Sequence, residues 1–263
     1  VVPVPENYNA KQRSRVIKTT VRNVIDGAYL FVDTDTVICK PLDDIDSLTC
    51  DMAAVPDGHL PLSVCMFPPT NSVNKIFKTD VSDSKYWFNS GVMFVADNEQ
   101  TRKFYKRWNE NWTYSCFKKG QSQDQPALLA TDKEFGYIIS ELPGIYNAQV
   151  AMSLKYFADA AIVHWWHMSF IENQDYSPFF SLQIYKDVKK FKGLSDETIE
   201  QIEHCKQSFV SPSMPVGKEH IYFLFSPAGK IFNRIYKEGG AACFLMNKCA
   251  SILEKIHKYT KKK

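Results

Sequence analysis

Several features that mark particular classes of protein are missing from this sequence. No apolar run approaches the roughly 18 to 20 residues that a membrane-spanning helix requires, and the chain does not open with a secretory signal pattern. Lys and Arg number 32 against 29 Asp and Glu, which is too balanced for a dedicated nucleic-acid binder. These absences predict a soluble globular protein with no nucleic-acid partner.

The seven cysteines also lack a recognisable arrangement. They are odd in number and scattered, and no two are spaced as Cys-x-x-Cys. This distribution indicates neither a disulfide framework nor a zinc cluster. A reducing compartment follows, so we predict a cytoplasmic location.

The size and composition are those of one large α/β domain or a domain with an appendage. The chain has 263 residues, of which 44% are hydrophobic and 23% are charged. Its character changes after about residue 170, where amphipathic helices are expected over 194–209 and 241–259, with a short strand over 221–225 between them. We therefore predict a core over residues 1–170 and a mainly helical extension over residues 171–263.

An apolar run that ends in Asp33-Thr34-Asp35 is the most informative segment. It predicts a buried strand over 28–33, preceded by a helix over 11–25. Alternate side chains of a strand point the same way, so both carboxylates can bind one hard cation and, through it, a diphosphate.

The Asp33-Thr-Asp35 pattern alone leaves other interpretations open. Aspartates after strands often form turns or cap helices. A haloacid-dehalogenase-like phosphatase also begins with this pattern, using the first Asp as nucleophile and the second as general acid/base.

Three further segments carry polar residues at positions suited to a site. Asn89-Ser90-Gly91 interrupts an apolar strand-like run over 86–95, which predicts close approach of the backbone to another group. Asp124-Gln125 begins a predicted helix, where Asp124 could be a helix cap only. An apolar strand over 160–166 contains His164, which could instead be a hydrogen-bonded core histidine.

A helix after Asp97 is expected to bury its aromatic face. Asp97 fits the N-cap position and Gln100 the partner position of a capping box. Aromatic residues then recur at helical spacing, which favours a core role over a binding platform. They are Phe104, Tyr105, Trp108 and Trp112.

Together these segments resemble glycosyltransferases of the GT-A fold, family 8, which includes glycogenin and bacterial lipopolysaccharide glycosyltransferases. The matching residues follow the family's order over roughly residues 11–168. They are Phe31-Val-Asp33-Thr-Asp35-Thr-Val, Phe88-Asn89-Ser90-Gly91-Val92, Asp124-Gln125 and Ile162-Val163-His164. The resemblance implies a Rossmann-like mixed sheet flanked by helices, with a C-terminal mainly helical extension.

The resemblance also implies a role for each matching residue. Asp33, Asp35 and His164 would hold Mn²⁺ or Mg²⁺, and the imidazole favours Mn²⁺. The donor sugar would lie against Asn89, Ser90 and Gly91. Asp124 and Gln125 would contact the sugar at the face where the reaction takes place. Lys18 is a weaker candidate for the diphosphate or ribose, with solvated helix surface as the alternative. The residues assigned to substrate binding are Lys18, Asn89, Ser90, Gly91, Asp124 and Gln125.

The expected activity is retaining transfer of a hexose from a nucleotide-diphosphate sugar, with UDP-hexose as the expected donor, to a glycan or lipid-linked glycan. The alternatives are an inactive remnant of the fold that binds a glycan or partner, and a phosphatase using Asp33. Two departures from the family bear on this. Trp165-Trp166-His167 follows His164 where the family has Gly and a lysine-containing segment, with His167 as a fallback ligand. Only 32 residues precede Asp33, so part of the nucleotide-binding segment is expected to be missing.

The last predicted helix has an apolar face and many lysines. Such a helix can lie on an anionic membrane surface, here the inner one, or dock on its own domain. The apolar face comprises Leu245, Cys249, Ile252, Leu253, Ile256 and Tyr259.

Overall fold

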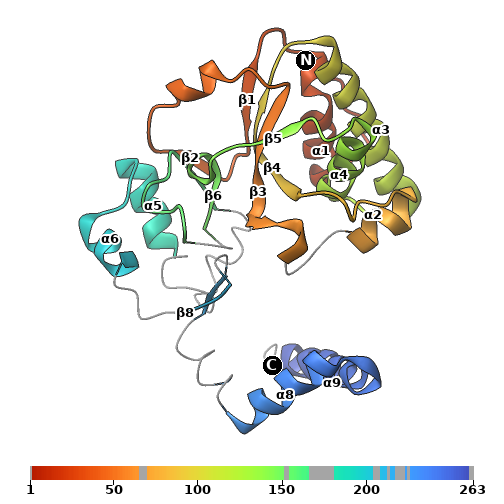
Figure 1. Ribbon diagram of the computed structural model, residues 1–263, viewed down its shortest axis with the longest axis vertical. Coiled ribbons are helices and arrows are strands. Elements are labelled where there is room, and N and C mark those ends of the chain that lie inside the picture. The colour runs from red at the N-terminus through yellow and green to blue at the C-terminus, as the bar shows by residue number, and fades with distance from the viewer. Residues whose placement is uncertain are drawn as a thin grey trace. The chain divides into compact units, whose positions relative to one another are not determined.

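The computed structural model describes residues 2–64, 70–150, 154–165, 181–203, 208–211, 214–216, 223 and 226–260. The chain divides into two compact units (Figure 1). The first comprises Val1–Cys205 and Phe209–Pro215, and the second comprises Lys206–Ser208 and Val216–Lys263. The site described below lies in the first unit.

A mixed four-stranded sheet is the centre of the first unit, with strand order β1-β4-β3-β5. β4 (Tyr86–Val95) pairs antiparallel with both β1 (Tyr29–Val32) and β3 (Met52–Pro61). β5 (Ile139–Glu141) pairs parallel with β3. The predicted mixed α/β architecture is therefore confirmed, and the run over 86–95 forms one strand as predicted.

Four helices accompany this sheet, and α1, α3 and α4 pack against one of its faces (Figure 1). Alternation along β3 explains the two-sided core, because Met52 and Ala54 face the helices while Ala53 and Val55 face the other side. The four predicted core aromatics of α3 are all buried. The helices are α1 (Ala10–Thr20), α2 (Thr70–Phe77), α3 (Glu99–Lys119) and α4 (Gln125–Glu134).

A second, three-stranded sheet has the order β2-β7-β6. β2 (Thr36–Ile38) pairs antiparallel with β7 (Ile162–His164), which pairs parallel with β6 (Ala148–Gln149). This sheet has its own hydrophobic cluster, in which Trp165 is fully buried. Trp165, the residue after His164, is therefore a core side chain.

The segment from Asp33 to Asp35 connects the two sheets. β1 ends at Val32, opposite Val92 of β4, and β2 begins at Thr36, opposite His164 of β7. A short connection of this kind holds its side chains close to both strand ends. The two aspartates are therefore positioned by two sheets at once.

The predicted capping box of α3 is displaced by one residue. Asn98 is the N-cap, and its side chain accepts a 2.9 Å hydrogen bond from the backbone N–H of Thr101. Asp97 instead accepts from the backbone N–H of Gly27 and forms an ion pair with Arg102, so its carboxylate is not free to cap the helix.

Shorter elements complete the described residues up to Val216. α5 and α6 follow the second sheet, and the helix predicted over 194–209 is too long because residues 208–209 belong to β8. Phe209 and Val210 in that strand are residues with high strand propensity. The remaining elements are α5 (Leu182–Phe191), α6 (Asp196–Glu203), β8 (Ser208–Ser211), β9 (Met214–Val216), and the 3-10 turns Val21–Asn23, Asp43–Ser47, Leu62–Val64 and Gly144–Asn147.

The second unit contains two helices, α8 (Pro227–Glu238) and α9 (Gly240–Thr260), and the helix predicted over 241–259 is confirmed. The predicted boundary near residue 170 lies outside the described residues, as does nearly all of the strand expected over 221–225. Among the described residues, no helix combines the length and the apolar character needed to cross a bilayer.

Candidate metal and sugar site

The backbone around Asp33 and Asp35 is fixed by hydrogen bonds to both sheets. The N–H of Asp33 donates to the carbonyl of Gly91 at 2.8 Å, and the N–H of Trp165 donates to the carbonyl of Asp35 at 2.9 Å. The hydroxyl of Thr36 donates to the carbonyl of Asp33 at 2.7 Å. The two carboxylates therefore extend from a well-anchored connection, and each remains partly exposed.

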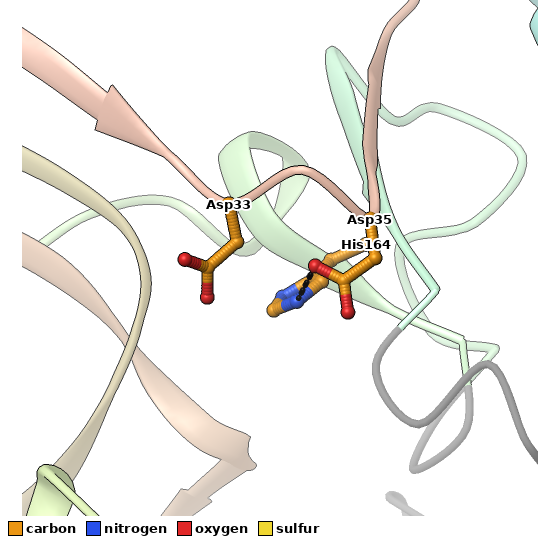
Figure 2. Close-up of side chains that lie close together, drawn as sticks. All are labelled: Asp33, Asp35 and His164. Atoms are coloured by element: carbon orange, nitrogen blue, oxygen red, sulfur yellow. Dashed lines mark ion pairs between the residues drawn. The ribbon is translucent and has the colours of Figure 1, made fainter. Parts of the chain in front are cut away.

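His164 faces these carboxylates from the end of β7 (Figure 2). Its side chain is buried, and Nε2 lies 3.3 Å from Oδ1 of Asp35. One ligand atom from each of Asp33, Asp35 and His164 can be chosen so that all three lie within 4.8 Å of one another. The structure thus brings together the three residues predicted as metal ligands.

A chain of amides determines which nitrogen of His164 carries the proton. The backbone N–H of Gly91 donates to Oδ1 of Asn89, and that oxygen also accepts from Nδ2 of Asn147. Oδ1 of Asn147 must then be the atom 2.9 Å from Nδ1 of His164, so Nδ1 is the donor. In a neutral ring, Nε2 therefore presents a lone pair toward Asp35.

This arrangement fits a divalent cation. A lone pair on Nε2 and a carboxylate oxygen 3.3 Å away are two acceptors facing each other, which a shared cation or a proton on Nε2 would stabilise. Opposite ligands of one Mg²⁺ ion are separated by roughly 4.2 Å, close to the spread of these three atoms. Two carboxylates with one imidazole are a ligand set suited to Mn²⁺ or Mg²⁺.

The two candidate metal-binding carboxylates differ in their electrostatic surroundings. Burial raises the pKa of Asp33 above its usual value, and the Lys18 ammonium only partly offsets this effect. Burial also acts to raise the pKa of Asp35, but a His164 ring protonated on Nε2, through its hydrogen bond and charge, outweighs burial and lowers that pKa. Asp35 is thus the more readily ionised of the two.

Lys18 is buried, so its interpretation as solvated helix surface is wrong. The side chain is 3% exposed, and Nζ donates to Oδ2 of Asp33 at 2.8 Å and to the carbonyl of Ser90 at 3.1 Å. Helix α1 delivers it because Val16, Lys18 and Thr19 lie on the buried part of the helix. The ammonium already has protein partners within the site.

Asp124 occupies the N-cap position of α4, but its side chain does not cap that helix. The carboxylate accepts a 2.7 Å hydrogen bond from the hydroxyl of Ser90, and its other oxygen lies 2.8 Å from Nε of Arg15. The Arg15 contact is an ion pair rather than an aligned hydrogen bond. Burial acts to raise the pKa of Asp124, but Lys18, Arg15 and Ser90 outweigh it and lower that pKa.

Asp57 joins the two predicted amide-bearing residues. Its Oδ1 accepts from Nδ2 of Asn89 at 2.8 Å and from Nε2 of Gln125 at 3.0 Å. Gln125 also donates to the carbonyl of Phe88 at 3.2 Å. The carboxylate therefore holds these two amides in one orientation.

Gly91 makes room for a side chain of the site. A Cβ atom at this position would lie 2.2 Å from Cε1 and 2.8 Å from Nδ1 of His164. We expected Gly91 to allow the backbone to approach a sugar, whereas in the structure the group that needs the space is the imidazole.

All nine predicted site residues take part in this connected set of contacts, but three participants were not predicted. Arg15, Asp57 and Asn147 were missed because none follows an apolar run in a recognisable motif. Asp57 lies within β3, and only its contacts with Asn89 and Gln125 mark it as part of the site. Trp166 and the fallback ligand His167 lie outside the described residues.

No protein-family profile and no curated protein sequence matches the chain. Among solved structures, mouse xyloside xylosyltransferase 1 is similar at 12% identity and a TM-score of 0.39 over 58% of this chain. The galactosyltransferase LgtC, solved with donor and acceptor sugar analogues, is similar at 14% identity and a TM-score of 0.43, over 75% of this chain and 74% of its own. The glycosyltransferase GlyE of Streptococcus pneumoniae TIGR4 is similar at 16% identity and a TM-score of 0.41 over 76% of this chain.

The chain spans 63% of the xylosyltransferase and 47% of GlyE.

Proposed function

We propose that the chain is a metal-dependent glycosyltransferase that moves a hexose from a nucleotide-diphosphate sugar to a glycan or lipid-linked glycan. The observation that carries this proposal is the meeting of Asp33, Asp35 and His164 in a group that could hold one cation. A hydrogen-bonded group containing Asp124 and Gln125 lies directly beside it. The phosphate and the sugar of one donor would occupy these adjacent parts.

Asp33, Asp35 and His164 would hold Mn²⁺ or Mg²⁺, with the imidazole favouring Mn²⁺. The bound dication would act as a Lewis acid toward the diphosphate leaving group. By accepting from Nδ1 of His164, Asn147 would leave Nε2 of that ring available to the cation.

The donor sugar would lie against Asn89, Ser90 and Gly91. The reacting face would be formed by Asp124 and Gln125, in keeping with retention of anomeric configuration. Retention proceeds by attack on the face that the leaving group departs from, or through a covalent adduct with a carboxylate. Asp124 is the carboxylate we assign to that adduct, and its lowered pKa keeps it ionised, as a nucleophile requires.

Calorimetric titration tests the metal and donor assignment. We expect Mn²⁺ and UDP together to bind the chain, and Asp35→Asn to weaken Mn²⁺ binding by at least about tenfold because it removes a charged ligand. Asp46→Asn, an exposed carboxylate in a 3-10 turn, is the matched control and should bind as the original chain does.

Failure of the original chain to bind either ligand at millimolar concentration would favour the alternative, an inactive remnant of the fold that binds a glycan or partner. The phosphatase alternative predicts something different. Hydrolysis of small phosphate esters that survives alanine at Asn89 and Asp124 but is lost on Asp33→Ala would replace the transferase assignment.

The proposal has a further part, which concerns the helices of the second unit. These helices would make peripheral contact with an anionic lipid surface on the cytoplasmic side. Several apolar side chains of α8 and α9 are more than half exposed. Residues 226–263 contain nine Lys and Arg against two Asp and Glu. Apolar and cationic groups on one helix pair are complementary to anionic lipid headgroups over an acyl layer. The exposed residues are Ile231, Tyr236, Phe244, Leu245, Ile252, Leu253, Ile256 and Tyr259.

A further inference from the structure

A lysine ammonium lies at the centre of the candidate site, between its two halves. Nζ of Lys18 is 2.8 Å from Oδ2 of Asp33, a candidate metal ligand, and 3.8 Å from Oδ2 of Asp124, the candidate nucleophile. Ser90 completes the surroundings, with its carbonyl at 3.1 Å and its hydroxyl at 3.4 Å. One fixed positive charge therefore touches both the phosphate side and the sugar side.

This charge cannot move away easily. The Lys18 side chain is 3% exposed, its acceptors surround Nζ, and the Phe31 ring lies 5.0 Å from that nitrogen. A buried ammonium is stable only while such partners remain, because leaving them would mean losing its hydrogen bonds without gaining water. The ammonium is thus expected to stay in place when ligands bind.

The Lys18 ammonium reduces the net negative charge of the site that would bind a cation. Asp33 and Asp35 supply two negative charges, but Lys18 neutralises part of this charge at Asp33. The cation would also be repelled by Nζ, since one carboxylate separates them. A metal alone therefore meets a weakened site, while a metal that arrives with a diphosphate brings its own compensating negative charge.

We propose that Lys18 makes binding of the metal and binding of the donor diphosphate depend on each other. The ammonium lowers the affinity of the free site for the cation and stabilises the site once the diphosphate is present. This inference rests on the proposed function and adds to it a control of the order in which the site fills. Lys18 is then a positioning and charge-balancing residue rather than a direct sugar ligand.

Titration calorimetry with Mn²⁺, with and without saturating UDP, tests the inference. In the original chain we expect UDP to tighten Mn²⁺ binding by about a hundredfold, a coupling of ordinary size for two linked sites. Lys18→Met and Lys18→Gln should bind Mn²⁺ alone more tightly and reduce the UDP effect by about tenfold. Lys18→Gln can retain hydrogen bonds, so agreement between the two variants assigns the effect to charge.

Two controls accompany these variants. Lys18→Arg keeps the charge and should keep most of the coupling. Lys11→Met removes an exposed lysine of the same helix and should leave both affinities unchanged. Thermal melting of each variant establishes that it is folded.

The outcomes separate this inference from the proposed function. Absence of Mn²⁺ and UDP binding in the original chain overturns both. Binding of Mn²⁺ that is equally tight with and without UDP overturns the inference alone, even if neither neutral variant folds. Coupling that persists undiminished in a folded Lys18→Met or Lys18→Gln also overturns it.

Discussion

At the scale of single residues, the site depends on side chains that hold other side chains. Asn147 connects Asn89 to His164, and Asp57 connects Asn89 to Gln125. Each of these contacts joins two side chains of the protein itself. A site that is already ordered avoids part of the entropy cost of ordering at the moment of binding.

Gly91→Ala should damage the metal site through His164. The added Cβ would lie 2.2 Å from the imidazole, so the ring must move away from Asp35. We expect Mn²⁺ affinity to fall by at least about tenfold and stability to fall by roughly 1–3 kcal/mol, as for other overpacked sites. Calorimetry and thermal melting measure the two effects.

Gly193→Ala provides the control, because a Cβ there meets no atom within 4 Å. If Gly91→Ala bound Mn²⁺ as well as Gly193→Ala does, the position assigned to His164 would be wrong.

Asp57→Ala should reduce transfer without preventing metal binding. The substitution removes the acceptor that orients the amides of Asn89 and Gln125. A loss of one orienting contact near a reacting centre typically lowers kcat/KM by roughly a hundredfold, while Mn²⁺ affinity should change little. Equal losses in Mn²⁺ affinity and in kcat/KM would instead indicate that the substitution disrupts the whole site.

At the scale of secondary structure, α4 has a buried aspartate near each of its ends. Asp124 stands at the start of α4 without capping it, and Asp132 near the end of α4 is buried. Asp132 accepts a 3.1 Å hydrogen bond from the backbone N–H of Ile139 in β5. This contact ties a helix end to an edge strand of the main sheet.

Asp132 should make stability depend on pH. Burial raises its pKa from 3.8 to about 7, although hydrogen bonds from Ile139 and Ile138 act in the opposite direction. The folded protein therefore binds a proton that the unfolded chain has lost, so this residue's contribution is greatest at low pH and decreases between about pH 4 and pH 7. Asp132→Asn should be more stable than the original chain at pH 8, and the advantage should shrink toward pH 5.

Urea unfolding of both proteins across this pH range measures the difference directly. The pairwise comparison also removes the contribution of His59, whose pKa burial lowers to about 4 and which acts in the opposite direction. A constant stability difference across the range would contradict the assignment.

The cap of α3 offers a second test at this scale. Asn98→Ala should lower stability by about 1 kcal/mol, the usual cost of losing an N-cap side chain. Gln100→Ala, at the position expected from sequence to complete a capping box, should have little effect. Urea unfolding of the two variants checks this, and a larger effect at Gln100 would favour the original prediction.

Local pattern explains which elements could be predicted. Continuous apolar or helical spacing predicted β4, α3 and α9 closely. Polar residues that interrupt or follow apolar strands, such as Asn89 in β4 and Asp33 after β1, were recognisable as site candidates. Arg15 and Asp57 could not be identified in this way. Their partners are distant in sequence, as with Asp57 and Gln125, so only the packed fold brings them together. The start of α3 was missed because Asp97 and Asn98 are both good caps, and a distant contact to Gly27 decides between them.

At the scale of the whole chain, charge is distributed unevenly. The chain has a net charge of +3, yet residues 226–263 contain nine basic and two acidic residues, so the remainder is net negative. Exposed apolar side chains accumulate in the same segment. The surface proposed to contact anionic lipid thus combines both features within residues 226–263.

Vesicle sedimentation tests the proposed lipid contact. The full chain should bind phosphatidylglycerol vesicles more strongly than phosphatidylcholine vesicles, and binding should weaken as salt rises from about 0.1 M to about 0.5 M. Leu253→Glu with Ile256→Glu should abolish it, because both side chains belong to the apolar face of α9.

Ala250→Glu with Ser251→Glu adds the same charge away from that face and should weaken binding only modestly. Equal loss in both double variants would indicate that charge alone governs binding. If the original chain showed no preference for anionic vesicles, the lipid contact would be excluded. If the original chain instead self-associated with rising concentration, and Leu253→Glu with Ile256→Glu removed this, the apolar face would be assigned to a second copy of the chain.

The connection from Asp33 to Asp35 has a consequence for local unfolding of the first unit. This connection joins the four-stranded sheet to the three-stranded sheet, and each sheet has its own hydrophobic cluster. His164 lies in β7 of the three-stranded sheet. A cation bound by all three residues would therefore act as a cross-link between two potential units of local unfolding. Backbone amides of β1, β2 and β7 should then exchange with solvent deuterium at one common, slower rate when Mn²⁺ and UDP are present, and at separate rates when they are absent.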